Sequence, residues 1–198
     1  EIAGRAGLIF RISRVTRFNS ELGLYESITY TVESAIALGA DGVIVSFYMG
    51  GKHEFASMRE VGLICAEADK WGLPCLVEAL PSQDVFKSFD DPEGIIYAVR
   101  SAAELGADII KAYLPSNVDI MKEVVRKTSV PIVLAGGEAA SARDVLKLAK
   151  IAMDAGLAGL CFGRKIFQYK DPTAMVRALS KIVHEGADVE EAMKELPE

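Results

Sequence analysis

The stretch AIALGADGVIV, residues 35–45, holds the end of a helix, a glycine turn and the start of a strand in direct succession. Its apolar residues first follow helical spacing and then run continuously, as they do in a buried strand. Gly39 stands where the chain must leave the helix in a left-handed conformation, which glycine adopts readily. The same joint recurs as AAELGADIIKA over residues 102–112 and as AMDAGLAGLCF over residues 152–162. A recurring helix-to-strand joint indicates a repeated structural unit.

Short apolar runs alternate with longer segments of helical period along the chain, which is the pattern of βα units around a parallel sheet. The predicted strands are Gly7–Ser13, Gly42–Phe47, Pro74–Ala79, Asp108–Tyr113, Pro131–Leu134 and Gly159–Phe162. The predicted helices are Tyr30–Leu38, Glu54–Trp71, Pro92–Leu105, Val118–Lys127 and Arg143–Ala155.

This spacing fits the α/β class and the repeats of a (β/α)8 TIM barrel, which usually has eight units in about 250 residues. We therefore expect one TIM-barrel domain over residues 1–198 that is incomplete at its N-terminus, with the first one or two strand–helix units absent from this chain. An open doubly wound sheet is the competing architecture, but no GxGxxG turn between a strand and a helix supports it.

The composition argues against several classes of function. A formal net charge of −6 disfavours nucleic acid as the main partner, because binding phosphate backbones relies on Lys and Arg. No apolar run approaches the roughly 18 to 20 residues that span a bilayer, and no secretory signal pattern opens the chain, so we expect a cytoplasmic protein without membrane contact. Cys65, Cys75 and Cys161 show no CxxC spacing, so we expect buried thiols without a disulfide framework or a zinc site.

A lysine stands in the predicted strand Asp108–Tyr113, where a lone buried charge is costly unless it is paired or neutralised. The period of two in a strand places Ile109, Lys111 and Tyr113 on one face. If this face is the barrel interior, Lys111 points into the active-site mouth, where a free amine can attack a carbonyl and form a Schiff base. That is aldol chemistry. The alternative is a strand-end lysine whose ammonium reaches solvent.

Two glycine turns follow the last two predicted strands, one at Gly136-Gly137 and one at Gly163-Arg164. TIM barrels frequently bind phosphate between the loops after strands seven and eight. Glycines let backbone N–H groups approach the anion, and Arg164 would add a charge-assisted contact. The alternative is that these glycines only make tight turns.

Glu78 and Arg11 are further charges embedded in apolar strands. Glu78 would act as an acid or base or orient the lysine, and Arg11 would offset a phosphate or pair with a carboxylate. A structural ion pair is the simpler interpretation of both. The longest loop, 82–92, follows a strand and would lie over the active-site face of a barrel.

Three segments together resemble the archaeal-type class I fructose-bisphosphate aldolase superfamily, whose relatives include the autoinducer-2 phosphate aldolase or thiolase and the amino-dideoxy-heptulosonate synthases. They are GADIIKAY (106–113), VPIVLAGGE (130–138) and GLCFGRKIFQ (159–168). The resemblance implies a barrel, assembly into homo-oligomers such as decamers, and Schiff-base chemistry on phosphorylated sugars without a metal or other cofactor. It matches Lys111 to the imine lysine, and Gly136, Gly137, Gly163 and Arg164 to the phosphate-binding turns.

One segment departs from the aldolases that cleave fructose bisphosphate. That branch ends the strand corresponding to Pro74–Ala79 with a YPRG-like sequence whose Tyr donates a proton, whereas this chain reads EALPSQ with Leu80 in that place. A leucine cannot transfer a proton. The segment FYMGGKHEFASM, residues 47–58, is closer to the autoinducer-2 phosphate branch. The substrate therefore stays open.

The sequence predicts a metal-independent class I aldolase, a lyase or an acyl or aldol transferase, that acts on a phosphorylated ketose or a related keto compound. Lys111 would be the nucleophile, with Tyr113 or Glu78 assisting proton transfer. Two alternatives remain. One is a phosphate-binding isomerase or synthase in which Lys111 acts only through its charge, and the other is a non-catalytic sugar-phosphate binding protein.

Overall fold

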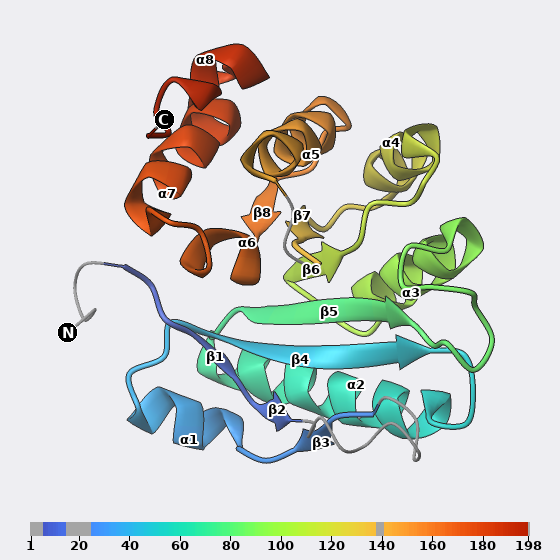
Figure 1. The fold of residues 1–198 in the computed structure, drawn as a ribbon. Helices are drawn as coiled ribbons and strands as arrows, with labels where there is room; N and C mark the ends of the chain where they lie inside the picture. Colours follow the sequence, from blue (N-terminus) through green and yellow to red (C-terminus); the bar gives the residue numbers. More distant parts are fainter. Residues whose placement is uncertain (1–5, 15–24, 138–140, 198) are drawn as a thin grey trace.

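A curled sheet of parallel strands forms the centre of the computed structural model, which describes residues 6–14, 25–137 and 141–197 (Figure 1). Six strands make up this sheet within the described residues, and each is parallel to its neighbours. In sheet order they are β1 (Ile9–Arg11), β4 (Gly42–Met49), β5 (Cys75–Pro81), β6 (Ile109–Ala112), β7 (Ile132–Ala135) and β8 (Gly159–Cys161). The strands follow one another in chain order. The sheet is therefore part of a TIM barrel, and the doubly wound alternative, in which strand order reverses, is wrong.

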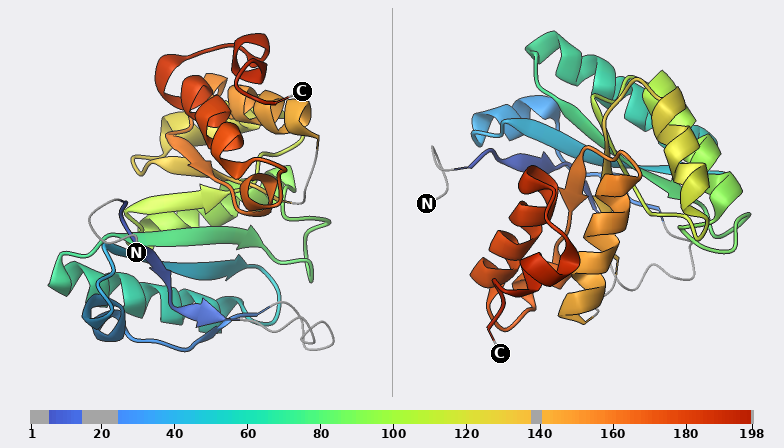
Figure 2. Two further views of the ribbon diagram at one scale, coloured as in Figure 1. Left: turned by 60° about the vertical axis from the view of Figure 1, so that its left-hand side comes forward. Right: turned by 90° about the horizontal axis from the view of Figure 1, so that it is seen from above.

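Helices cover the outer face of the sheet, as Figure 2 shows from above. They are α1 (Val32–Ala37), α2 (Glu54–Trp71), α3 (Pro92–Glu104), α4 (Val118–Lys127) and α5 (Ala142–Asp154). All five were predicted, and two match to the residue. The C-terminal part adds α6 (Arg164–Phe167), α7 (Pro172–Ser180), η2 (Lys181–Glu185) and α8 (Val189–Met193), which form a second apolar cluster with α5. No helix in residues 6–14, 25–137 and 141–197 is long and apolar enough to cross a bilayer.

The predicted first strand, Gly7–Ser13, is divided in the structure. The N–H of Ile12 still donates to the Ile44 carbonyl in the main sheet (3.1 Å), but its own carbonyl accepts from Thr29 (2.8 Å). The chain thus changes its hydrogen-bonding partner at Ile12. The next residues form β2 (Ser13–Arg14), which pairs antiparallel with β3 (Ser27–Ile28) outside the main sheet. This short antiparallel pair was not predicted.

The repeated helix-to-strand joints have the conformation expected from the sequence. Gly39, Gly106 and Gly156 all have positive φ angles, of 79°, 97° and 91°. In two joints the following aspartate performs the same task. Asp41 accepts the N–H of Leu8 (2.7 Å), and Asp108 accepts the N–H of Cys75 (2.8 Å). Each aspartate therefore ties the start of its own strand to the start of the preceding strand in the sheet.

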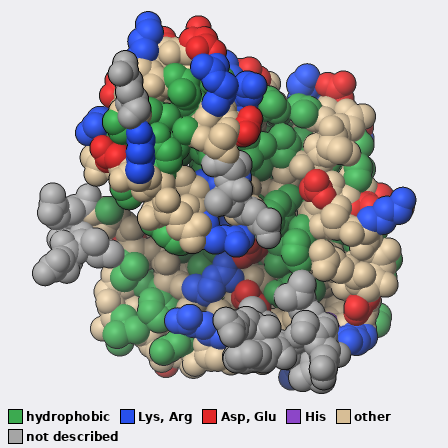
Figure 3. All heavy atoms as spheres, viewed as in Figure 1, with side chains coloured by type: hydrophobic (Ala, Val, Ile, Leu, Met, Phe, Trp, Pro, Cys, Tyr) green, Lys and Arg blue, Asp and Glu red, His purple; other side chains and the backbone are tan. Residues whose placement is uncertain are grey.

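Strand alternation separates an apolar outer face of the sheet from an inner face that also carries polar and charged side chains. The side chains of Val45, Phe47, Val77, Ile110 and Ala112 are fully buried in the main core with the helices. The intervening positions carry Ser46, Glu78 and Lys111, which are paired in register across β4, β5 and β6. Figure 3 shows basic and acidic side chains gathered in a hollow in the middle of this face. The sheet therefore presents its charged residues on the concave side.

Candidate active site

One cavity of about 310 Å³ at the carboxyl ends of the strands is lined by every residue that the sequence nominated for the site. These are Glu78, Lys111, Tyr113, Gly136, Gly137, Gly163 and Arg164. Arg11, Cys161 and Phe167 complete the lining. The carboxyl ends of the strands are where TIM-barrel enzymes keep their active sites. The cavity is therefore the candidate active site.

Lys111 lies on the concave face of β6 and is paired with a carboxylate. Its Nζ is 2.7 Å from Oε1 of Glu78, and the two side chains are only 15% and 11% exposed. The lysine does not extend into solvent, so the alternative of a snorkelling strand-end lysine does not describe it. The ion pair also explains how a charged residue is accommodated in an otherwise apolar strand, because each charge compensates the other.

Glu78 is held from its other side by Arg11, whose Nη2 donates to Oε2 of the carboxylate. The second terminal nitrogen of Arg11 lies 2.8 Å from Oε2 of Glu26 and donates to Oγ of Ser46 at 2.9 Å. Ser13 donates to the same Glu26 oxygen at 2.5 Å. Charges of alternating sign thus run across the concave face. Arg11 is paired with carboxylates, in agreement with the prediction of a structural ion pair.

The pKa of Glu78 lies below its ordinary value. Burial alone would raise this pKa, but the adjacent Lys111 ammonium and then the Arg11 guanidinium favour the carboxylate more strongly. Glu78 is therefore ionised near neutral pH and able to accept a proton from a partner that it already contacts. A carboxylate in direct contact with an amine is the arrangement that general base catalysis requires.

Tyr113 is the first residue after β6 and lies two residues beyond Lys111. Its ring stacks on Phe89 with centroids 5.7 Å apart, so the long 82–92 loop reaches the cavity. Burial, and then the charge of Glu78, raise the pKa of Tyr113. The phenol therefore keeps its proton near neutral pH and can act as a hydrogen-bond donor or a general acid.

The two glycine turns meet at the far end of the cavity. A Cβ on Gly136 would lie 3.1 Å from the ring of Phe162 and 3.3 Å from its Cα, so a larger residue would press on the loop after β8. Gly137 has a φ of 65°, and its carbonyl accepts from Nη2 of Arg164 at 3.4 Å. Within the described parts of the chain, Arg164 has no carboxylate partner. Its charge is thus available to an anionic ligand.

Residues 2–169 match the DeoC/LacD family aldolases. The chain belongs to this family. It is 38% identical over 168 residues to the 2-amino-3,7-dideoxy-D-threo-hept-6-ulosonate synthase of Halobacterium salinarum, covering 83% of this chain and 62% of that protein. It is 35% identical over 168 residues to a class 1 fructose-bisphosphate aldolase from the same species, and this match covers 84% of this chain and 64% of that protein. The chain thus spans less than two thirds of the length of these two relatives.

Solved structures lead to the same family. An archaeal fructose-1,6-bisphosphate aldolase, with its catalytic Lys covalently bound to the carbinolamine intermediate of the substrate, matches this DeoC/LacD chain with a TM-score of 0.84. The identity is 29%, and the match covers 91% of this chain and 72% of that one. The resemblance inferred from the lysine strand and the glycine turns is therefore confirmed, as is the barrel architecture.

Sequence reasoning missed several polar residues of this DeoC/LacD family site. Ser46 was detectable, because alternation along β4 places it on the concave face, but Glu26 lies in no pattern that indicates its role. The expectation of buried thiols holds for Cys65 and Cys75, whose Sγ atoms lie 3.6 Å apart, and is wrong for Cys161. Cys161 is half-buried and lines the cavity because it is the last residue of β8, which ends there.

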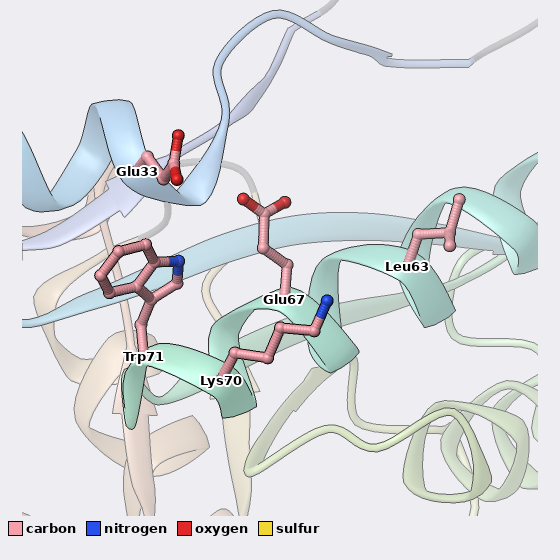
Figure 4. Close-up of a pocket in the computed structure, with 5 residues that line it drawn as sticks. All are labelled: Glu33, Leu63, Glu67, Lys70 and Trp71. Carbon is pink, nitrogen blue, oxygen red and sulfur yellow. The ribbon is translucent and has the colours of Figure 1, made fainter.

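A second hollow, of about 550 Å³, lies on the outer surface between α1 and α2 (Figure 4). Its lining residues are Glu33, Leu63, Glu67, Lys70 and Trp71. Figure 4 shows Glu67, Lys70 and Trp71 on α2 with Glu33 opposite on α1. The hollow lies behind the sheet, away from the carboxyl ends of the strands, and none of its lining residues was nominated for the chemistry of this DeoC/LacD family member.

Proposed function

We propose that this protein is a metal-independent class I aldolase that forms a Schiff base between Lys111 and a phosphorylated ketose or related keto compound. The observation that carries the proposal is the Lys111–Glu78 contact of 2.7 Å inside a cavity that has Arg164 and two glycine turns at its other end. The family and the named activities of its relatives support the same chemistry.

The lysine and its carboxylate partner perform the first steps. Glu78 accepts a proton from the Lys111 ammonium, and the free amine attacks the ketone carbon to form a carbinolamine. Loss of water gives a protonated imine. The bond that breaks joins the carbon next to the imine carbon (Cα) to the carbon beyond it (Cβ). The protonated imine accepts the electron pair of this bond, so that an enamine remains on the lysine and Cβ departs as the carbonyl carbon of an aldehyde.

Proton transfer in the later steps falls to Glu78 and Tyr113. The hydroxyl of the departing aldehyde must lose a proton as the bond breaks, and the enamine carbon must regain one. Glu78 is suited to accept a proton because it is ionised, whereas Tyr113 is suited to donate one because its pKa is raised. Leu80, which replaces the tyrosine of the fructose-bisphosphate branch, has no group for this task.

The substrate phosphate would bind at the glycine turns. Gly136, Gly137 and Gly163 allow the backbone to approach an anion closely, and Arg164 supplies the positive charge. Holding the phosphate at this end fixes the distance between the keto group and Lys111. In this way binding energy from a non-reacting group orients the carbonyl for attack.

Borohydride trapping tests the proposal. The protein is incubated with dihydroxyacetone phosphate, fructose 1-phosphate or fructose 1,6-bisphosphate in the presence of EDTA, reduced, and analysed by intact mass and peptide mapping. We expect a covalent adduct on Lys111, no adduct in Lys111→Met, and an unchanged adduct in a control variant of a surface lysine, Lys122→Met. Binding of these phosphates without an adduct would instead support a phosphate-binding isomerase, synthase or non-catalytic binding protein.

The proposal extends to the setting of the enzyme. We propose a cytoplasmic homo-oligomer, such as a decamer, that uses neither a metal nor another cofactor. The resemblance to the archaeal-type aldolases supports an oligomer. Light scattering coupled to size exclusion, at several protein concentrations, would give the mass of the assembly, and a mass equal to one chain throughout would contradict this part of the proposal.

A further inference from the structure

Arg11 raises a question that the proposed mechanism leaves unanswered. Its guanidinium lines the cavity and its side chain is 31% exposed. A cation in a cavity that binds a phosphorylated substrate would ordinarily be assigned to the phosphate. Arg11 is located on β1, however, across the cavity from the glycine turns that follow β7 and β8, so its contacts must decide what it does.

Both terminal nitrogens of Arg11 are already engaged. One donates to Glu78, and the other lies 2.8 Å from Glu26 and 2.9 Å from the hydroxyl of Ser46. The guanidinium is thus enclosed between two carboxylates, each of which compensates its charge. A phosphate at this place would have to displace a carboxylate or approach one closely, and either event is unfavourable.

The two oxygens of Glu78 are divided between two cations. Oε2 faces Arg11, and Oε1 faces Lys111 at 2.7 Å. Rotating the carboxylate out of this orientation would break both contacts. Arg11 therefore determines which oxygen is directed at the lysine, and Glu26 and Ser46 in turn determine the position of Arg11.

We propose that Arg11 is a positioning residue for the proposed aldolase reaction: anchored by Glu26, it holds Glu78 ionised and directed at Lys111, and it does not bind the substrate phosphate. This inference rests on the proposed function. It assigns the phosphate to Arg164 alone among the described arginines that line the cavity.

The electrostatic surroundings of Glu78 support this role. Its charged and titratable neighbours are Lys111 from β6, Tyr113 just after β6, Arg11 from β1 and Tyr48 from β4, with Glu26 behind Arg11. Removing the guanidinium would leave Glu26 and Glu78 without the cation between them. The Arg11 guanidinium, after Lys111, is one of the two cations that lower the pKa of Glu78, so its loss would raise this pKa and Glu78 would take up a proton at a higher pH than in the wild type.

The test compares Arg11→Met and Arg11→Lys with Arg164→Met, and uses Arg100→Met, in an exposed pair on α3, as the control. Two quantities are measured for each variant. The first is the pH profile of the borohydride trapping rate with dihydroxyacetone phosphate, and the second is the concentration of inorganic phosphate that halves trapping. Circular dichroism establishes that each variant is folded.

For Arg11→Met we expect the acidic limb of the profile to move up by about one pH unit or more, with the half-inhibiting phosphate concentration changed less than about twofold. The acidic limb of Arg11→Lys should lie at a pH between those of Arg11→Met and the wild type, because a single ammonium replaces a guanidinium that contacts both carboxylates. Arg164→Met should show the opposite behaviour. The acidic limb of its pH profile should stay where it is in the wild type, and the phosphate concentration that halves trapping should rise about tenfold. The control should match the wild type.

Two results would overturn the inference. One is an Arg11→Met variant that weakens phosphate inhibition as Arg164→Met does, and the other is an acidic limb that stays in place. Should Arg11→Met fail to fold, the double variant with Glu26→Gln removes the uncompensated carboxylate, and its limb should still move upward. A wild-type protein without any adduct would refute the proposed function itself, and the inference with it, whereas an adduct with an unmoved limb refutes the inference alone.

Discussion

Replacing Glu78 with glutamine should destabilise the protein by about 3 kcal/mol, because it leaves two partly buried cations without their shared counter-ion. At 2.7 Å and an effective dielectric constant of about 20, the attraction between Glu78 and Lys111 is roughly 6 kcal/mol before desolvation. Desolvation offsets much of this, and removing one member of a buried pair typically costs about 3 to 5 kcal/mol. The side chains of Lys111 and Arg11 are 15% and 31% exposed, so we expect a cost at the lower end of this range.

Urea denaturation measures this loss. With a slope of about 2 kcal/mol per molar urea, the midpoint of Glu78→Gln should fall by about 1.5 M. The matched control is Glu104→Gln, which breaks an exposed pair with Arg100 and should cost less than about 0.5 kcal/mol. Equal midpoints for the two glutamine variants would refute the reasoning, because the contacts of Glu78 would then be worth no more than a surface ion pair.

The same comparison has a predictable pH dependence. The pKa of Glu78 is lowered in the folded protein, so the unfolded chain binds the proton more readily. The stabilising contribution of the carboxylate is therefore complete above its unfolded pKa of about 4.3 and is lost as the pH falls through the lower folded value. The stability difference between wild type and Glu78→Gln should be constant from pH 8 to about 5 and shrink below that range. A difference that grows on acidification would contradict the assigned direction.

Further predictions concern the phosphate end and the thiols. Gly137→Ala and Gly186→Ala should each cost about 1 to 2 kcal/mol in urea denaturation, since φ is 65° and 72°, but only the first should weaken phosphate inhibition of trapping; equal inhibition constants would contradict the placement of the anion. Iodoacetamide should modify Cys161 before Cys65 or Cys75, and inorganic phosphate should slow that modification. Peptide mapping checks the order, and early modification of Cys65 would contradict it.

Local patterns in the sequence were sufficient to predict the architecture and the face of the sheet on which Lys111 lies. Apolar period and glycine position defined the joints around Gly39, Gly106 and Gly156, because a helix end and a strand start are determined by neighbouring residues. The period of two along the predicted strand Asp108–Tyr113 placed Lys111 and Tyr113 on one face for the same reason. Both kinds of signal act over a few residues, which is why a single sequence carries them.

Contacts between distant residues could not be obtained in this way. The chain leaves the main sheet at Ile12 because Thr29 competes for its carbonyl, and nothing near Ile12 in the sequence indicates that competition. Glu26 reaches Arg11 only because β2 and β3 pair. The sequence therefore showed Arg11 and Glu78 as separate charged residues, and their connection emerged from the order of the strands.

The absence of a tyrosine at position 80 can be related to the position of Glu78 on the same strand. Alternation along β5 puts both side chains on the concave face, with Glu78 deeper in the barrel and in contact with the lysine. A phenol at position 80 would serve as a proton donor beside the substrate, whereas a carboxylate at position 78 acts on the lysine itself and can both accept and return a proton. In the proposed mechanism Tyr113, and not a phenol at position 80, donates the proton beside the substrate, while Glu78 depends on the charges of Lys111 and Arg11 for its ionised form. Under the same proposal Arg11 holds this carboxylate from β1, and this role would account for an arginine in an apolar strand across the cavity from the turns proposed to bind phosphate.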